Sequence, residues 1–153
     1  MEIEQYNFSI SYQMFDNLIE KEMKAIWNER IGGFIAWQQI FHVLSGLRYW
    51  MKDRNEEHED DYLKLRIYPE LEKDPEDRLT IDQILMYKAD LNNQIDLYFN
   101  KKDDAWLLEE SIVDTSKTNL EIILMEIRHI QYHLGCFESY LRDKRIKTQE
   151  WID

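Results

Sequence analysis

Hydrophobic residues recur at helical spacing along most of this chain, and the two-residue alternation typical of strands is nearly absent. The pattern predicts four long helices, over residues of about 9–28, 34–52, 80–100 and 118–142. In the first of them, apolar residues three or four positions apart form a stripe that faces a core, namely Phe15, Leu18, Ile19, Met23, Ile26 and Trp27. The sequence therefore predicts an all-α fold.

The second predicted helix is apolar on almost every side, which indicates that it is largely buried. Its apolar positions are Phe34, Trp37, Ile40, Phe41, Val43, Leu44, Leu47, Trp50 and Met51. His42 lies in the middle of this segment, so we expect its side chain to be enclosed. Gly32 and Gly33 stand just before the helix and predict a turn between it and the first helix.

The third and fourth helices each begin with the pattern of a capping box, Thr80 with Gln83 and Thr118 with Glu121. Charged connectors at residues 53–78 and 101–117 precede them. A helix of about 19 residues is about 29 Å long, and the first connector is long enough to span that distance twice at about 3.3 Å per residue. The second and third helices can therefore run parallel. We expect one domain over residues 1–153.

The charge balance limits the partners of the chain. There are 19 Lys and Arg residues against 31 Asp and Glu, a net charge of -12, which would repel nucleic acid and an anionic membrane surface. No apolar run approaches the ~20 residues that cross a bilayer, and the start of the chain is acidic rather than basic. The lone Cys136 excludes an internal disulfide. We expect a cytoplasmic protein that binds a small molecule.

His129 and His133 stand four residues apart in the fourth predicted helix, so both side chains leave the same helix face. Two imidazoles in this relation can chelate one metal ion. With His42 they would make an incomplete shell of three neutral ligands, as in catalytic sites that keep a position open. The alternative is that these are hydrogen-bonded core histidines. Spacing alone leaves both interpretations open.

On the fourth predicted helix, the two histidines lie neither on the face that points to the core nor on the face that points to solvent. The predicted core face carries Ile123, Ile127, Ile130, Leu134 and Phe137, and the predicted solvent face carries Arg128, Gln131, Glu138 and Arg142. His129 and His133 fall on a third stripe with Glu126 and Cys136. This stripe is expected to face a neighbouring helix or a cleft between helices.

Glu126 and Cys136 have competing interpretations. Glu126 could accept a hydrogen bond from a histidine ring, accept a proton, or be a charge at the rim of the site, and the rim charge is the preferred interpretation. Cys136 could be a thiolate ligand, but a small buried hydrophobe is favoured. Ile130 follows His129 where a zinc protease has its glutamate, so that mechanism does not apply.

Three further polar residues, Gln38, Ser45 and Tyr49, flank His42 within one or two helical turns. They could line the same pocket or serve as structural hydrogen-bonding groups. His58 stands in an acidic stretch and is expected to be a solvated loop residue.

The run from Arg128 to Gly135, taken with the run from Trp37 to Leu44, resembles the DinB/YfiT-like superfamily. The resemblance covers nearly the whole chain in helix order, connector lengths and histidine placement. It implies a four-helix bundle in up-down-down-up order, with His42, His129 and His133 as ligands of a divalent metal ion. In this family a glycine commonly stands two residues after the last histidine, where this chain has Gly135. Many members have Gln in the next position, where this chain has Cys136.

Characterised members of this family resemble thiol-dependent enzymes, among them S-transferases that use low-molecular-weight thiols and a maleylpyruvate isomerase. The resemblance therefore implies Zn²⁺, Ni²⁺ or Fe²⁺ in the site and a low-molecular-weight thiol as cosubstrate. It also implies a homodimer, for which Trp106 and Trp151 are candidate exposed aromatic residues. The competing hypothesis is a non-catalytic stress or interaction protein whose metal is structural or absent.

Overall fold

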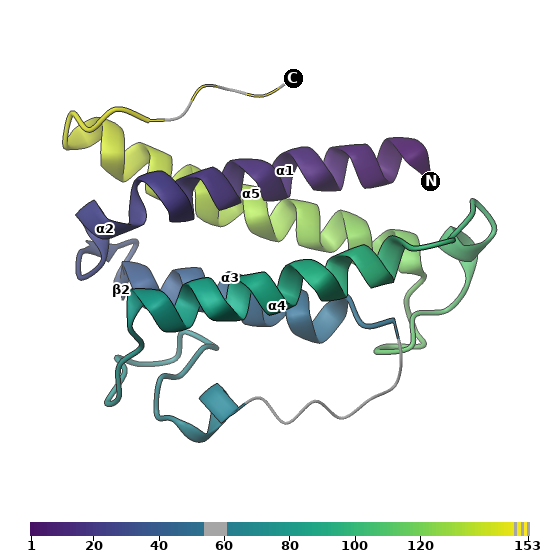
Figure 1. The fold of residues 1–153 in the computed structure, drawn as a ribbon, viewed down its shortest axis with the longest axis horizontal. Coiled ribbons are helices and arrows are strands. Elements are labelled where there is room, and N and C mark those ends of the chain that lie inside the picture. Colours follow the sequence, from purple (N-terminus) through teal and green to yellow (C-terminus); the bar gives the residue numbers. More distant parts are fainter. Residues whose placement is uncertain (54–60, 149, 151, 153) are drawn as a thin grey trace.

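The structure is a computed structural model, and it describes residues 1–53, 61–148, 150 and 152. The chain is mostly helical (Figure 1), with 3-10 turns at Asp61–Lys64 and Trp106–Leu108. The α-helices are α1 (Glu2–Lys21), α2 (Met23–Ile26), α3 (Ala36–Trp50), α4 (Ile81–Phe99) and α5 (Asn119–Asp143). Two short strands, β1 (Arg30–Ile31) and β2 (Phe34–Ile35), form a small antiparallel sheet.

The predicted first helix differs most from the observed one. The observed α1 begins at Glu2, whereas the prediction placed its start near residue 9. It ends at Lys21, after which α2 forms a separate short helix. The acidic residues Glu2 and Glu4 suit the positive end of the helix dipole and favour this early start. The hydrophobic stripe does not reveal these residues, because the first buried side chain of α1 is Phe8.

Gly32 and Gly33 form the predicted turn, but the structure adds a pair of strands around it. Both glycines have positive φ angles, 59° and 98°, as the two central residues of a tight hairpin turn require. Arg30 lies opposite Ile35, and Ile31 lies opposite Phe34. Two residues per strand are too few for an alternating pattern to appear in the sequence.

The two capping boxes predicted from the sequence are confirmed. The side chains of Thr80 and Thr118 accept hydrogen bonds from the backbone N–H groups of Gln83 and Glu121. The Gln83 and Glu121 side chains accept in return from the backbone N–H groups of the two threonines. The starts of α4 and α5 are therefore fixed by local sequence.

The long helices lie side by side in pairs, α1 with α5 and α3 with α4, and α3 also packs against α5. In Figure 1, α1 and α5 begin at the right of the molecule, whereas α3 and α4 both begin at the left. The contact between α3 and α5 positions the candidate site, since these two helices carry the histidines singled out above.

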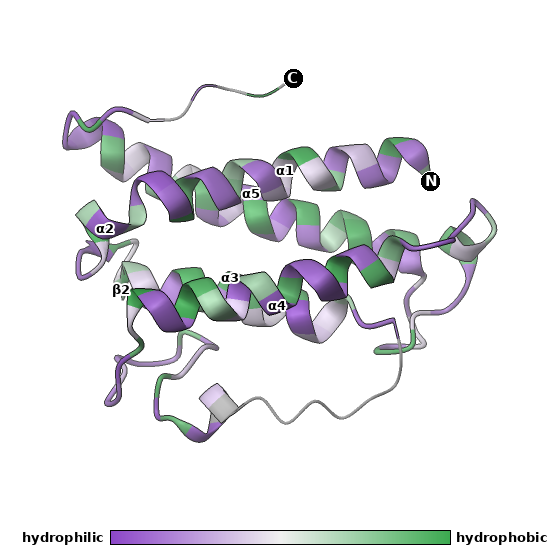
Figure 2. Cartoon of the chain, in the orientation of Figure 1, coloured by the Kyte–Doolittle hydropathy of each residue, from purple (hydrophilic) through white to green (hydrophobic). Residues whose placement is uncertain are grey.

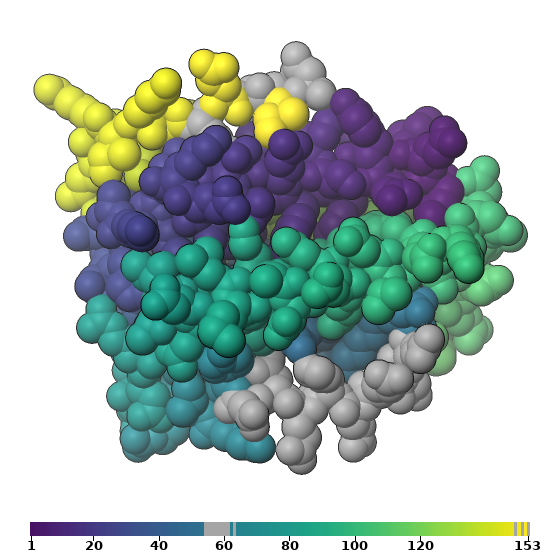
Figure 3. Space-filling view, in the orientation of Figure 1, coloured from purple at the N-terminus to yellow at the C-terminus, as the bar shows by residue number. Residues whose placement is uncertain are grey.

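The core is formed mainly by the inward faces of these helices, and α3 is the most enclosed of them. Nine of its 15 residues are buried, as its apolar sequence predicts. Figure 3 shows α1 and α4 side by side on this face of the molecule, with little of α3 visible below α4. Figure 2 shows hydrophobic and hydrophilic residues alternating from turn to turn along the long helices. Within the described residues, no helix combines the length and the apolar character needed to cross a membrane.

On α5, Ile123, Ile130, Leu134 and Phe137 are buried as predicted for the core face, whereas Ile127 is only half-buried. Glu138, expected on the solvent face, is buried instead and forms an ion pair with Arg142 at 3.2 Å. That expectation was wrong because α1 packs against α5, and a projection of one helix does not include its neighbours.

Candidate metal centre

Three histidines from two helices meet between α3 and α5. His42 comes from α3, His129 and His133 come from α5, and their candidate ligand atoms all lie within 4.8 Å of one another. The Nε2 atoms of His42 and His129 are 2.8 Å apart. The ring centroids are separated by 4.7, 4.9 and 5.2 Å. The structure thus brings together the three histidines that the sequence singled out.

Each of the three rings contacts an oxygen acceptor through its Nδ1 atom. The Nδ1 of His42 lies 2.7 Å from the backbone carbonyl of Pro69. The Nδ1 of His129 lies 3.1 Å from a carboxylate oxygen of Glu126. For His133 the partner is the side-chain carbonyl of Gln39, at 3.4 Å. A carbonyl or carboxylate oxygen only accepts, so each Nδ1 carries the proton and donates it.

The tautomers fixed in this way leave the lone pair of each ring on Nε2. The Nε2 atoms of His42 and His129 then face each other at 2.8 Å as two acceptors. Two lone pairs at this distance repel unless a cation or a proton lies between them. Histidine ligands of metals characteristically donate their other ring N–H to a carbonyl or carboxylate, and all three rings do so here. The donor set therefore fits a metal ion.

The surroundings keep two of the imidazoles neutral. Burial, followed by the positive charges that His42 and His129 would carry, lowers the pKa of His133 from 6.5 to about 3. Burial is also the main cause that lowers the pKa of His42, and a charge on His129 adds to it. The Pro69 carbonyl and Glu70 oppose this shift. Neutral imidazole is the form that binds a metal, so at neutral pH these two rings are ready to do so.

Glu126 is buried, with only 1% of its surface exposed. The preferred interpretation of this residue as a charge at the rim was therefore wrong. Its carboxylate accepts from His129, which is the hydrogen-bonding role considered among the alternatives. Glu126 precedes His129 by three residues, and residues three apart are neighbours on a helix. The burial of Glu126 could not be inferred from the sequence of α5 alone.

A glycine in the middle of α3 makes room for one of the rings. A Cβ atom placed on Gly46 would lie 3.0 Å from Cε1 of His129 and 3.5 Å from its Nδ1. Any larger residue would push against the ring from the side of α3. Gly135, which the family resemblance singled out, has no comparable packing role, because a Cβ atom placed there would meet nothing within 4 Å.

The other candidate residues are less directly involved. Cys136 is half-buried against the edge of the core and does not belong to the histidine cluster. Gln38 is fully buried and donates to the carbonyls of Ile67, Tyr68 and Lys73. It therefore anchors the connector that carries Pro69. His58 lies outside the described residues.

Sequence reasoning missed Gln39, Gly46 and Pro69 as parts of this site. Gln39, His42 and Gly46 are spaced by three and four residues, so they share one face of α3. Once His42 was a candidate ligand, that spacing could have identified Gln39 and Gly46 as its neighbours on the helix face. No pattern in the sequence marks Pro69, because it contributes its backbone carbonyl, which every residue carries, from a connector outside the helices.

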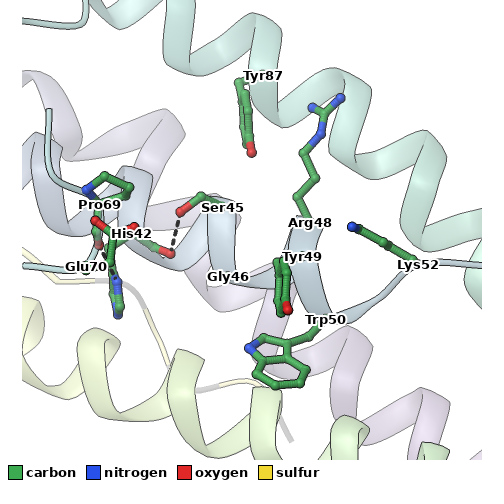
Figure 4. A pocket seen from close by; sticks show the side chains of 10 residues that line it. All are labelled: His42, Ser45, Gly46, Arg48, Tyr49, Trp50, Lys52, Pro69, Glu70 and Tyr87. Carbon is green, nitrogen blue, oxygen red and sulfur yellow. Dashed lines mark hydrogen bonds between the residues drawn. The ribbon is translucent and has the colours of Figure 1, made fainter. Parts of the chain in front are cut away.

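A cavity of about 430 Å³ adjoins the histidine cluster. His42 and Gly46, both in contact with His129, form part of its wall (Figure 4). Ser45 and Tyr49, two of the residues expected near His42, also line it. The rest of its wall comes from the end of α3, from α4 and from the connector, through Arg48, Trp50, Lys52, Pro69, Glu70 and Tyr87.

Comparisons with protein-family models, with curated proteins and with solved structures each give no match. Among the described residues, the three histidines are the group whose atoms are close enough together to hold a metal ion.

Proposed function

We propose that this protein is a divalent-metal-dependent enzyme of the DinB-like type, with its four long helices in up-down-down-up order. In this proposal His42, His129 and His133 hold Zn²⁺, Ni²⁺ or Fe²⁺. The observation that carries it is the approach of three imidazole ligand atoms to within 4.8 Å of one another, each ring donating from its other nitrogen to an oxygen.

The reaction that we propose is transfer of a low-molecular-weight thiol to an electrophilic small molecule. A divalent ion held by three neutral imidazoles keeps its full charge and favours ionisation of a thiol bound beside it. The sulfur then forms a bond to an electrophilic carbon of the substrate, and the leaving group departs with the bonding electron pair. The thiol proton passes to solvent or to a nearby acceptor.

The protein's own residues would position these reactants. Pro69, Glu126 and Gln39 fix the orientation of the three rings through the Nδ1 contacts. Burial of His133 restricts the approach of water from its side of the cluster. The cavity beside His42 provides space for a small molecule next to the histidines.

A turnover assay with metal-loaded protein tests the reaction. Small thiols would be combined with chlorodinitrobenzene, from which the thiolate displaces chloride to give a coloured thioether. We expect metal-dependent turnover that chelation abolishes and that His133→Ala lacks. A protein that binds the metal but gives no turnover with any thiol, and whose cobalt-loaded absorption spectrum does not change when thiol is added, would instead support the structural or non-catalytic alternative.

A further inference from the structure

Tyr98, near the end of α4, has a buried hydroxyl group that the packing of the core does not explain. Its side chain is enclosed, with 2% of the residue exposed. Among the residues that the structure describes, none forms a hydrogen bond with the hydroxyl oxygen. A buried hydroxyl without a hydrogen bond destabilises a fold, and phenylalanine would fill the same space without this cost. The hydroxyl group of Tyr98 therefore calls for a role.

Packing ties Tyr98 to the face of α5 that carries Glu126. The ring of Tyr98 lies 5.1 Å from the ring of Trp106, measured between centroids. The backbone carbonyl of Trp106 accepts a hydrogen bond of 2.9 Å from the side chain of Asn119, at the start of α5. Asn119 and Glu126 are seven residues apart, or about two helical turns, so they share one face of the helix. Both are buried on that face.

The charge of Glu126 reaches the hydroxyl group of Tyr98. Burial is the main cause that raises the pKa of Tyr98, and the negative charge of Glu126 raises it further. An ionised carboxylate can accept several hydrogen bonds, and Nδ1 of His129 supplies one of them at 3.1 Å. A phenol O–H group is a suitable second donor, because hydrogen bonds to an ionised acceptor are stronger than those between neutral groups.

We propose that Tyr98 is a positioning residue of the candidate metal centre, whose hydroxyl group donates to Glu126 while Glu126 accepts from His129. A bridging water or a small rotation of the phenol closes the link, since the two side chains make no direct hydrogen bond. A second donor holds the carboxylate ionised and in one orientation, which in turn fixes the ring of His129. The inference rests on the proposed function, since it adds to that site a residue from α4, a helix that contributes no ligand.

Urea unfolding of the metal-free protein tests the link without any metal. Tyr98→Phe keeps the ring and removes only the hydroxyl group. We expect a lower urea midpoint, because a hydrogen bond to a charged group is lost. In the Glu126→Gln background the same change should lower the midpoint much less, since the two residues are coupled. A higher midpoint in Tyr98→Phe, as removal of an unsatisfied hydroxyl would give, or equal losses in both backgrounds, would overturn the proposal.

Metal binding tests the positioning role. Competition with a chromogenic chelator should show Zn²⁺ affinity about tenfold lower in Tyr98→Phe, at the lower end of the losses caused by such partners, and no further loss when it is combined with Glu126→Gln. The visible absorption of the cobalt-loaded protein should also shift, because it reports the arrangement of the ligand rings. An unchanged affinity and an unchanged spectrum in Tyr98→Phe would contradict the positioning role.

Tyr12→Phe is the matched control. The hydroxyl group of Tyr12, on α1, donates to the side chain of Asn92 at 2.7 Å and takes no part in the histidine cluster. This variant should lower the urea midpoint through the lost hydrogen bond but keep the Zn²⁺ affinity and the cobalt spectrum. Equal effects of Tyr12→Phe and Tyr98→Phe on metal binding would show that general destabilisation is the cause, and the proposal would fail.

The metal-free measurement separates this inference from the proposed function. If no metal binds but Tyr98 and Glu126 are coupled in unfolding, the hydrogen-bonded link stands and the metal-dependent function fails. If the metal binds and Tyr98→Phe raises the urea midpoint, the link fails and the metal centre stands.

Discussion

At the scale of single residues, the buried carboxylate of Glu126 lies 3.1 Å from Nδ1 of His129 and orients that ring. In Glu126→Gln a neutral amide replaces the carboxylate, which weakens the acceptor that orients the ring. We expect metal affinity to fall about tenfold to a hundredfold, as is typical for loss of such a partner. Competition with a chromogenic chelator measures the change.

Glu138→Gln is the control for this variant, because Glu138 is also buried on α5 but pairs with Arg142 rather than with a histidine. Its metal affinity should equal that of the unaltered protein. Equal affinities for all three proteins would show that Glu126 does not support the site.

The lowered pKa of His133 predicts how stability depends on pH in the metal-free protein. In the unfolded chain this group titrates near 6.5, whereas in the folded protein its pKa is about 3. Between these values the unfolded state binds more protons. The contribution of the neutral ring to stability is therefore complete above about pH 6.5 and is lost as the pH falls toward 3.

Urea unfolding near pH 7 and near pH 5 measures this loss. We expect the metal-free protein to lose about 1 to 2 kcal/mol more over this interval than His133→Gln, which has no group to protonate at that position. The same loss in both proteins would mean that His133 is not held neutral by the fold.

At the scale of the elements, the approach of α3 to α5 at Gly46 controls where the His129 ring can lie. Gly46→Ala places a methyl group 3.0 Å from Cε1 of that ring, so the ring must move by a few tenths of an ångström. Because coordination of a metal would require a fixed position of this ring, we expect metal affinity to fall by about tenfold, at the lower end of the losses caused by disturbed ligand orientation. Calorimetric titration with Zn²⁺ measures it.

Gly135→Ala is the matched control, since open space surrounds that position on α5. It should retain metal affinity and gain up to about 1 kcal/mol in stability, because alanine is the better helix former. Unchanged affinity in Gly46→Ala as well would indicate that α3 and α5 separate easily at this point.

The elements themselves could be predicted where local sequence determines them. The capping boxes at Thr80 and Thr118 set the starts of α4 and α5, and the apolar sequence of α3 marks it as buried. The β1–β2 hairpin and the early start of α1 could not be predicted from hydrophobic spacing, since they depend on two glycine conformations and on a helix dipole.

The candidate site was predicted as far as its three histidines, because spacing on α5 and the family resemblance both point to them. Its other parts depend on how segments pack. The burial of Glu126, the space left at Gly46 and the carbonyl of Pro69 all arise from contacts between segments distant in sequence. Periodicity within one helix carries no information about such contacts.

At the scale of the whole molecule, the expected homodimer stays a prediction. Trp106 does not support it as an exposed residue, because it is half-buried and packs against Tyr98 at 5.1 Å between ring centroids. Trp151 lies outside the described residues. Light scattering after size-exclusion chromatography should give twice the 18.8 kDa mass of one chain. A mass of one chain at all concentrations would exclude the dimer.

We propose that His42, His129 and His133 together bind one divalent metal ion. Elemental analysis of protein purified without an affinity tag, after dialysis against Zn²⁺, tests this most directly. We predict one ion per chain in the unaltered protein and none in His42→Ala or His133→Ala, with circular dichroism showing that the helices persist. Protein without bound metal, or full metal content in the His42→Ala and His133→Ala variants, would contradict the account.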